Sequence, residues 1–151
     1  MKRFRFSLRS VAVLRAHRET RAREQFAASV HAYVRAEEEL AMVRRRIKEF
    51  GDAIFASRRE LFDASEHALC LAGYRRECAS EIPAERAVID AKDAMAKRRA
   101  DYLEAHRELE AVRKLEEKNL LAYRAACNRE EQVEFDEMAG HRAGRKAAFG
   151  T

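Results

Sequence analysis

The sequence predicts an all-α protein, folded as one long antiparallel two-helix coiled-coil hairpin. Two observations predict this class: the composition and an unusually regular apolar seam. Of 151 residues, 38% are charged and 47% hydrophobic, with one Pro and five Gly. A chain that poor in turn-forming residues is typical of long helices. Trp is absent and aromatic residues make up 8% of the chain, so we expect extended binding surfaces instead of an enclosed pocket.

The apolar seam runs through residues 26–71 in alternating steps of three and four. Twelve of its fourteen positions are apolar, two are serine and none is charged. A 3.5-residue period held over this length is typical of a helix that keeps one face against a partner helix. The seam consists of Phe26, Ser29, Tyr33, Ala36, Leu40, Val43, Ile47, Phe50, Ile54, Ser57, Leu61, Ala64, Ala68 and Leu71.

The strongest turn signals lie at Gly73 and in the segment from Cys78 to Pro83. Proline suits the first turn of a helix, and Ser80 is a suitable N-cap for it. A second, less regular seam then runs from Val88 to Met138. We therefore expect one domain, with a first helix over about 7–79, a turn at about 73–83, a second helix over about 83–142 and a flexible tail at 143–151.

A turn at that place sets the expected pairing of the two helices. Facing residues would have numbers that sum to roughly 160 to 166, which puts Ile54 near Leu109 and both termini at one tip. The seam slips between Leu14 and Phe26, so the start of the first helix, capped by Ser7 or Ser10, is expected to be splayed or held by something else. Stability is expected to lie in the middle of the hairpin.

The net charge of +5 is concentrated at the N-terminus. Residues 1–25 hold eight Lys or Arg and two Glu, whereas residues 128–151 hold four basic and five acidic residues. A basic end indicates an acidic protein, nucleic acid or an anionic membrane surface as partner. Neither a secretory signal nor a membrane-spanning run is expected, and the odd count of three Cys favours a reducing compartment.

The sequence offers little that could support catalysis, so we expect no enzyme, no cofactor and no metal. His67, Cys70 and Cys78 would make only a partial zinc site, and small buried cysteines are common in helices. Phosphate-binding glycine loops and nucleophile elbows are missing. A zipper-type DNA reader is also disfavoured, because residues 1–25 contain no Asn to read bases.

Short motifs at the two ends resemble the flagellar export protein family FliJ. The opening Phe4-Arg5-Phe6-Ser7-Leu8, followed by the pair Leu14-Arg15, is similar to the family's Phe-x-Phe-x-Leu start and Leu-Arg pair. The closing Asp136-Glu137-Met138-Ala139 with Arg142 is similar to its Asp-Glu-x-Ala-x-x-Arg ending. The injectisome counterpart, the SctO (YscO-like) family, shares this architecture, so both systems stay open here.

The resemblance implies a non-enzymatic stalk and escort protein of type III export. Its partners would be the hexameric export ATPase, the FlhA-like cytoplasmic domain of the export gate and export chaperones, in the cytoplasm at the inner membrane. A self-associating structural coiled coil, or a nucleic-acid or membrane-surface binder, is the alternative. The implied ATPase-binding tip comprises Phe4, Phe6, Leu8, Arg9, Val11, Leu14, Arg15, Phe135, Met138 and Arg142. The implied gate contact, beside the run Ala36-Glu37-Glu38-Glu39-Leu40, comprises Glu39, Val43, Arg46 and Phe50, two of which also belong to the seam.

Overall fold

The computed structural model describes residues 3–58 and 63–148, with side chains to residue 142. It contains two helices, α1 (Arg9–Ser57) and α2 (Ala64–Ala148), and no strand among the residues described. The expected all-α helical hairpin is confirmed. The chain divides into two compact units. Unit 1 contains Met1–Arg18 and His106–Thr151, and unit 2 contains Glu19–Ala105.

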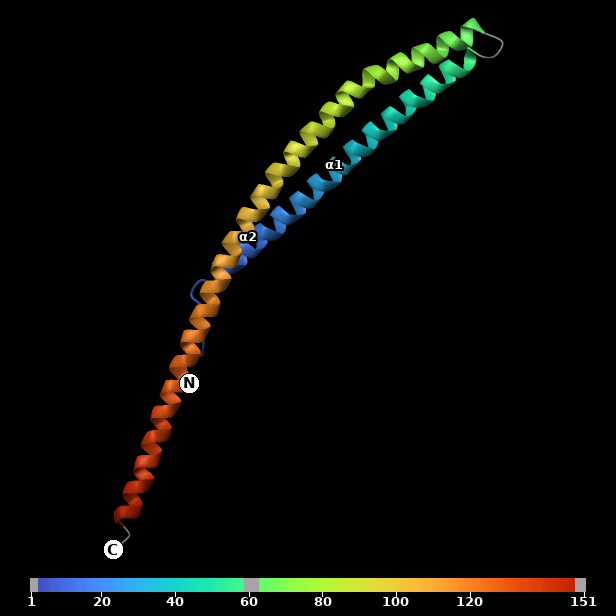
Figure 1. The fold of residues 1–151 in the computed structure, drawn as a ribbon. Helices are drawn as coiled ribbons and strands as arrows, with labels where there is room; N and C mark the ends of the chain where they lie inside the picture. The colour runs from blue at the N-terminus through green and yellow to red at the C-terminus, as the bar shows by residue number, and fades with distance from the viewer. Residues whose placement is uncertain (1–2, 59–62, 149–151) are drawn as a thin grey trace. The chain divides into compact units, whose positions relative to one another are not determined.

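The predicted seam forms the contact between α1 and α2 in unit 2, where the two helices lie side by side (Figure 1). Every seam position from Phe26 to Ser57 is buried or half-buried, and Val43 is the most buried. Ion pairs flank the seam, with Arg46 Nε 3.0 Å from Glu77 Oε2. Another joins Arg44 to Glu81 at 2.9 Å. Beyond Ser57 the prediction is less accurate, since Ala64 and Ala68 are exposed, and Leu61 lies outside the described residues.

The turn predicted at residues 73–83 is wrong. The first helix ends at Ser57, the second begins at Ala64, and Pro83 lies inside α2. A proline within a helix leaves the carbonyl of the residue four positions earlier without its usual donor. Here Ala79 and Pro83 are both exposed, so water can satisfy that carbonyl. The flexible tail predicted at residues 143–151 is wrong for residues 143–148, because α2 continues to Ala148. Residues 149–151 lie outside the described residues.

Asp63 provides the signal that starts α2. Its Oδ1 accepts hydrogen bonds from the Ser65 backbone N–H at 2.8 Å and from Ser65 Oγ at 2.5 Å. These bonds, together with the backbone N–H of Glu66, lower the pKa of Asp63 below its ordinary value of 3.8. Asp63-Ala64-Ser65-Glu66 therefore resembles a capping box, in which the N-cap side chain satisfies free N–H groups of the first turn.

Replacing Asp63 by alanine is expected to lower the melting temperature near neutral pH, because the first turn of α2 loses its cap. A carboxylate with a lowered pKa stabilises the folded state above its ordinary pKa, and this contribution disappears as pH falls through the lowered value. The difference between wild type and Asp63→Ala in circular-dichroism melts should therefore shrink as the pH falls below the ordinary pKa of 3.8. Asp63→Asn, which keeps a cap without the charge, is the control, and a melt equal to that of Asp63→Ala would contradict the assignment.

Because the turn lies between Ser57 and Ala64, the pairing register of the two helices also differs from the predicted one. In unit 2, Ser57 Oγ lies 3.1 Å from His67 Nδ1, a pair whose numbers sum to 124. In unit 1, Arg15 donates a 2.9 Å hydrogen bond to the Glu108 carbonyl, a pair whose numbers sum to 123. The predicted sum of roughly 160 to 166 is therefore wrong, as is the pairing of Ile54 with Leu109.

Candidate protein-binding surface

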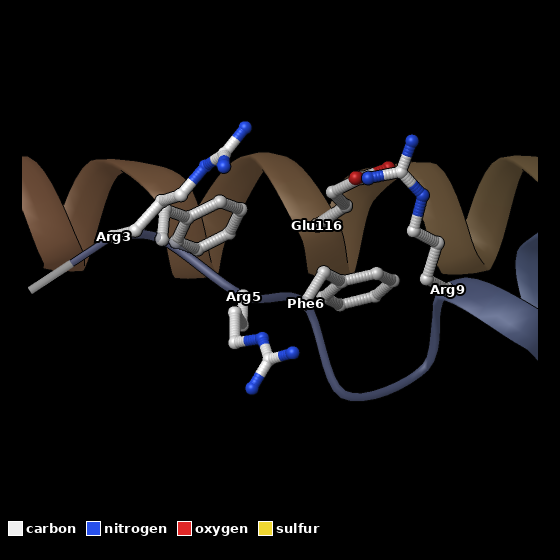
Figure 2. A pocket seen from close by; sticks show the side chains of 6 residues that line it. Arg3, Arg5, Phe6, Arg9 and Glu116 are labelled. Atoms are coloured by element: carbon white, nitrogen blue, oxygen red, sulfur yellow. The ribbon is translucent and has the colours of Figure 1, made fainter.

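Residues 3–8 form an N-terminal segment that precedes α1 and packs against α2 within unit 1 (Figure 2). The Phe4 ring lies 5.5 Å from the Tyr123 ring, and the Phe6 side chain is 9% exposed. A hydrogen bond with Cys127 raises the pKa of Tyr123, with burial contributing, so its phenol stays protonated near neutral pH. Of the two alternatives expected from the sequence, a splayed end or an end held by something else, the structure agrees with the second, because these two rings are held against α2.

The start of α1 is set by backbone geometry. The Phe6 carbonyl accepts a hydrogen bond from the Arg9 N–H at 3.3 Å, and the Leu8 carbonyl accepts one from Ala12 at 2.9 Å. Leu8 therefore occupies the N-cap position. Neither Ser7 nor Ser10, the residues predicted to cap, lies there. The turn at residues 7 and 8 is what allows the segment to run back along α2.

Unit 1 also contains most of the buried apolar side chains of the described residues. The exposed fractions are 9% for Phe6, 4% for Leu109 and 3% for Val112, and the fourth buried side chain is Val43 of unit 2 at 7%. Burial of this kind is the main source of stability in a helix pair. The expectation that stability lies only in the middle of the hairpin is therefore not supported by the packing.

On the outside of this unit, both apolar and basic side chains are exposed. Leu8, Val11 and Leu14, all predicted, are exposed, as is Val13, which the sequence reading missed. Arg3, Arg5 and Arg9 border a hollow beside Phe4 and Phe6 (Figure 2). Arg15 differs from them, because it donates to the Glu108 carbonyl and lies 3.8 Å from the Glu108 carboxylate. We call the following set the N-terminal surface: Arg3, Arg5, Leu8, Arg9, Val11, Val13 and Leu14.

The remaining predicted tip residues lie farther along α2. Phe135, Met138 and Arg142 are exposed, and Phe135 is twelve residues beyond Tyr123, or roughly 18 Å along the helix. The single tip predicted from both termini is therefore wrong, because the earlier turn leaves α2 longer than α1. We call residues 128–142 the C-terminal arm. Its acidic residues, to which the sequence reading gave no role, are Glu130, Glu131, Glu134, Asp136 and Glu137.

Three of the four residues implied at the gate contact already have partners inside unit 2. Val43 is buried, and Arg46 is paired with Glu77. The Phe50 ring lies so close to the backbone of Gly73 that a Cβ there would be 2.7 Å from Phe50 Cε1. Glu39 is exposed. The conflict between seam and gate contact is thus resolved in favour of the seam for Val43 and Phe50.

The described residues offer no site for metal chemistry. No group of three or more His, Cys, Asp or Glu side chains gathers among them, and His67, one member of the partial zinc set, lies beside Ser57 Oγ. In the same part of the chain, neither helix contains a stretch apolar enough to cross a membrane. The chemistry of this surface is therefore that of exposed aliphatic and arginine side chains on a helix pair, which suits protein recognition.

These features define a helical-hairpin protein with its charged and apolar side chains on open helix faces. Comparison with protein families matches residues 4–148 to the family described as Flagellar FliJ protein. The chain belongs to this family, a family of structural or escort proteins, and accordingly has a role in flagellar protein export. Comparisons with curated proteins and with solved structures gave no match.

Proposed function

We propose that the protein is a stalk that binds the hexameric flagellar export ATPase through unit 1. One observation supports this most strongly: Leu8, Val11, Val13 and Leu14 are exposed on a unit whose underlying core is the best buried in the described chain. Leu8, Val11 and Leu14 are three residues apart and follow one side of α1, and exposed apolar side chains in such a row are typical of binding surfaces. Neighbouring arginines suit acidic or carbonyl groups of a protein partner.

We further propose that α1 contacts the export gate through its outward face in unit 2. Glu39 and the exposed Met42 lie three residues apart, on one helix face. The buried Val43 and Phe50 are excluded from this contact, because the pairing with α2 uses them. Bound to gate and ATPase, the protein would sit in the cytoplasm at the inner membrane, where it would also meet export chaperones.

Replacing the exposed Leu8 and Leu14 together by alanine is expected to weaken ATPase binding at least tenfold. Each truncation removes an aliphatic anchor worth about 1 kcal/mol or more at a binding surface, and the two together exceed the 1.4 kcal/mol of a tenfold change. Phe4 is less suitable for this test, since its ring packs on Tyr123. Co-sedimentation with the purified hexameric ATPase measures the binding, and circular dichroism verifies that helix content is kept.

The matched control is Ile82→Ala with Ile89→Ala, which removes two exposed isoleucines of unit 2. That variant should bind like wild type. Charge reversal at Arg5 and Arg9 should slow association and increase its salt dependence. Full binding by the Leu8 and Leu14 variant, or equal losses in the isoleucine control, would contradict unit 1 as the ATPase-binding part. Binding that depends on charge alone and falls steeply with salt would instead favour nucleic acid as partner.

A further inference from the structure

Among the described residues, no second helix packs on the C-terminal arm. The N-terminal segment reaches the arm's first turn, where Arg3, Phe4 and Arg5 border a hollow with Cys127 and Glu130, and α2 then continues to Ala148. From residue 132 to residue 142 every side chain is exposed. Val133, Phe135 and Met138 are the large apolar side chains among them. A helix with apolar side chains this exposed gains stability when a second surface covers it.

The charge of the arm matches the N-terminal surface of the same unit. The N-terminal surface contains three Arg and no acidic residue, a balance of +3, and Glu116 of α2 borders the same hollow as these arginines. Residues 128–142 contain two Arg and five acidic residues, a balance of −3. Glu130, Glu134 and Glu137 lie on one helix face and border a shallow hollow with Arg129 and Val133. Each segment therefore carries the charge that the other would need in a partner.

Within one copy of the chain the two segments meet only at the start of the arm. Arg3, Phe4 and Arg5 border a hollow with Glu130, while residues 131–142 continue α2 away from the N-terminal segment. A second copy removes this restriction, because an antiparallel arrangement brings each arm alongside the other copy's N-terminal surface. The lengths agree: the stretch between Glu108 and Tyr123 and the arm both span roughly 22 to 24 Å at 1.5 Å per residue.

We propose that unit 1 binds a second copy of this chain in an antiparallel, two-fold symmetric dimer. In it, the acidic arm of each copy covers the basic N-terminal surface of the other. A two-fold interface uses the same pair of surfaces twice, so both complementary contacts form together. The aliphatic side chains of the N-terminal surface pack against Val133, which borders the same hollow as Glu130, Glu134 and Glu137, and against Met138, one turn beyond Glu134. The proposal goes beyond ATPase binding. In the dimer, the N-terminal surface that we propose for the ATPase is covered by the arm of the second copy.

Charge-reversed variants of the full chain test the dimer. The first, N-reversed, carries Arg3→Glu, Arg5→Glu and Arg9→Glu. The second, arm-reversed, carries Glu130→Lys, Glu134→Lys and Glu137→Lys. Sedimentation velocity without any ATPase should show a concentration-dependent dimer for wild type, weakened by added salt. Each variant alone should be monomeric, because its two surfaces now carry the same sign of charge.

An equal mixture of the two variants should recover the dimer. In a mixed pair, the acidic N-terminal surface of one faces the basic arm of the other, and the two unchanged surfaces face each other. The control Asp90→Lys, Asp93→Lys and Glu104→Lys makes the same change in net charge as arm-reversed, at exposed positions of unit 2, and should dimerise like wild type. Circular dichroism of each variant verifies the helix content.

Three outcomes would overturn the proposal. Wild type could remain monomeric at about 100 μM at low salt, which would leave the two surfaces to other proteins. Either variant alone could dimerise like wild type, or the mixture could fail to recover the dimer while both variants keep their helix content. ATPase binding, measured separately by co-sedimentation, is unaffected by these results, so the failure of one proposal is distinguishable from the failure of the other.

Discussion

Replacing Leu109 by alanine is expected to destabilise unit 1 by about 2 to 5 kcal/mol, the usual range for a buried leucine. Leu109 is 4% exposed, and a helix pair has no third layer that could move in to fill the space it leaves. A change of this size is a large fraction of the stability of a small domain. Urea unfolding followed by circular dichroism at 222 nm measures it.

Leu115, six residues along the same helix, is 47% exposed and provides the control. The same substitution there should change stability by no more than about 0.5 kcal/mol, as is usual for surface positions. Because the units can unfold separately, hydrogen exchange of amides near residue 109 would show where the loss occurs. Equal losses at both positions would mean that Leu109 is not part of a packed core.

The seam of α1 could be predicted from the sequence because its physical cause is local. Every third or fourth residue from Phe26 to Ser57 faces α2, and a charged side chain at any of these positions would lose water without gaining a partner. The spacing alone therefore identified the helix, its inner face and the all-α class. The existence of a second, antiparallel helix followed from the weaker second seam and from the single Pro between the two seams.

The turn could not be placed in the same way, because Pro83 and Asp63 each mark a possible start of the second helix. A single proline in a chain of 151 residues is a strong reason to end a helix, but exposure of Ala79 and Pro83 makes the lost hydrogen bond inexpensive. The Asp63-x-x-Glu66 pattern marks the actual start of α2, where Ser65 donates hydrogen bonds to Asp63. A capping box is short, and tertiary pairing decides whether a chain uses it.

The error in the turn explains the errors in the site. Moving the reversal from residues 73–83 to the stretch between Ser57 and Ala64 shifts every facing pair, so Phe4 meets Tyr123. The predicted residues Leu8, Val11 and Leu14 are still exposed, since their outward position depends on the face of α1 and not on the register. Which residues of α2 accompany them depends on the register alone.

The packing at Phe50 supports a second large effect. A Cβ added to Gly73 would lie 2.7 Å from Phe50 Cε1, and one added to Gly51 would lie 4.0 Å from Tyr74 Cε2. Each helix thus places an aromatic ring against a glycine of the other, but only the Phe50 ring uses all the space that its glycine leaves. Glycine costs about 1 kcal/mol within a helix relative to alanine, and the close approach of this ring is the compensation at Gly73.

Gly73→Ala is therefore expected to have opposite effects in two backgrounds. In wild type, overpacking against Phe50 costs about 1 to 3 kcal/mol, which exceeds the gain in helix propensity, so unit 2 is destabilised. In Phe50→Ala, the ring is gone and the same substitution should stabilise by about 1 kcal/mol. The coupling in this double-mutant cycle, measured by urea unfolding, should be about 1 to 3 kcal/mol.

Two other glycines of the same helices show what Gly→Ala does without a ring in the way. Gly140 has no heavy atom within 4 Å of its added Cβ, and Gly51 has only an ordinary van der Waals contact. Alanine at either position should stabilise by about 0.5 to 1 kcal/mol. If Gly73→Ala also stabilised wild type, the Phe50 ring would have turned aside at little cost. The contact between Phe50 and the Gly73 backbone would then not fix the spacing of α1 and α2 in unit 2, and the register there would depend on the ion pairs of Arg44 and Arg46 with α2.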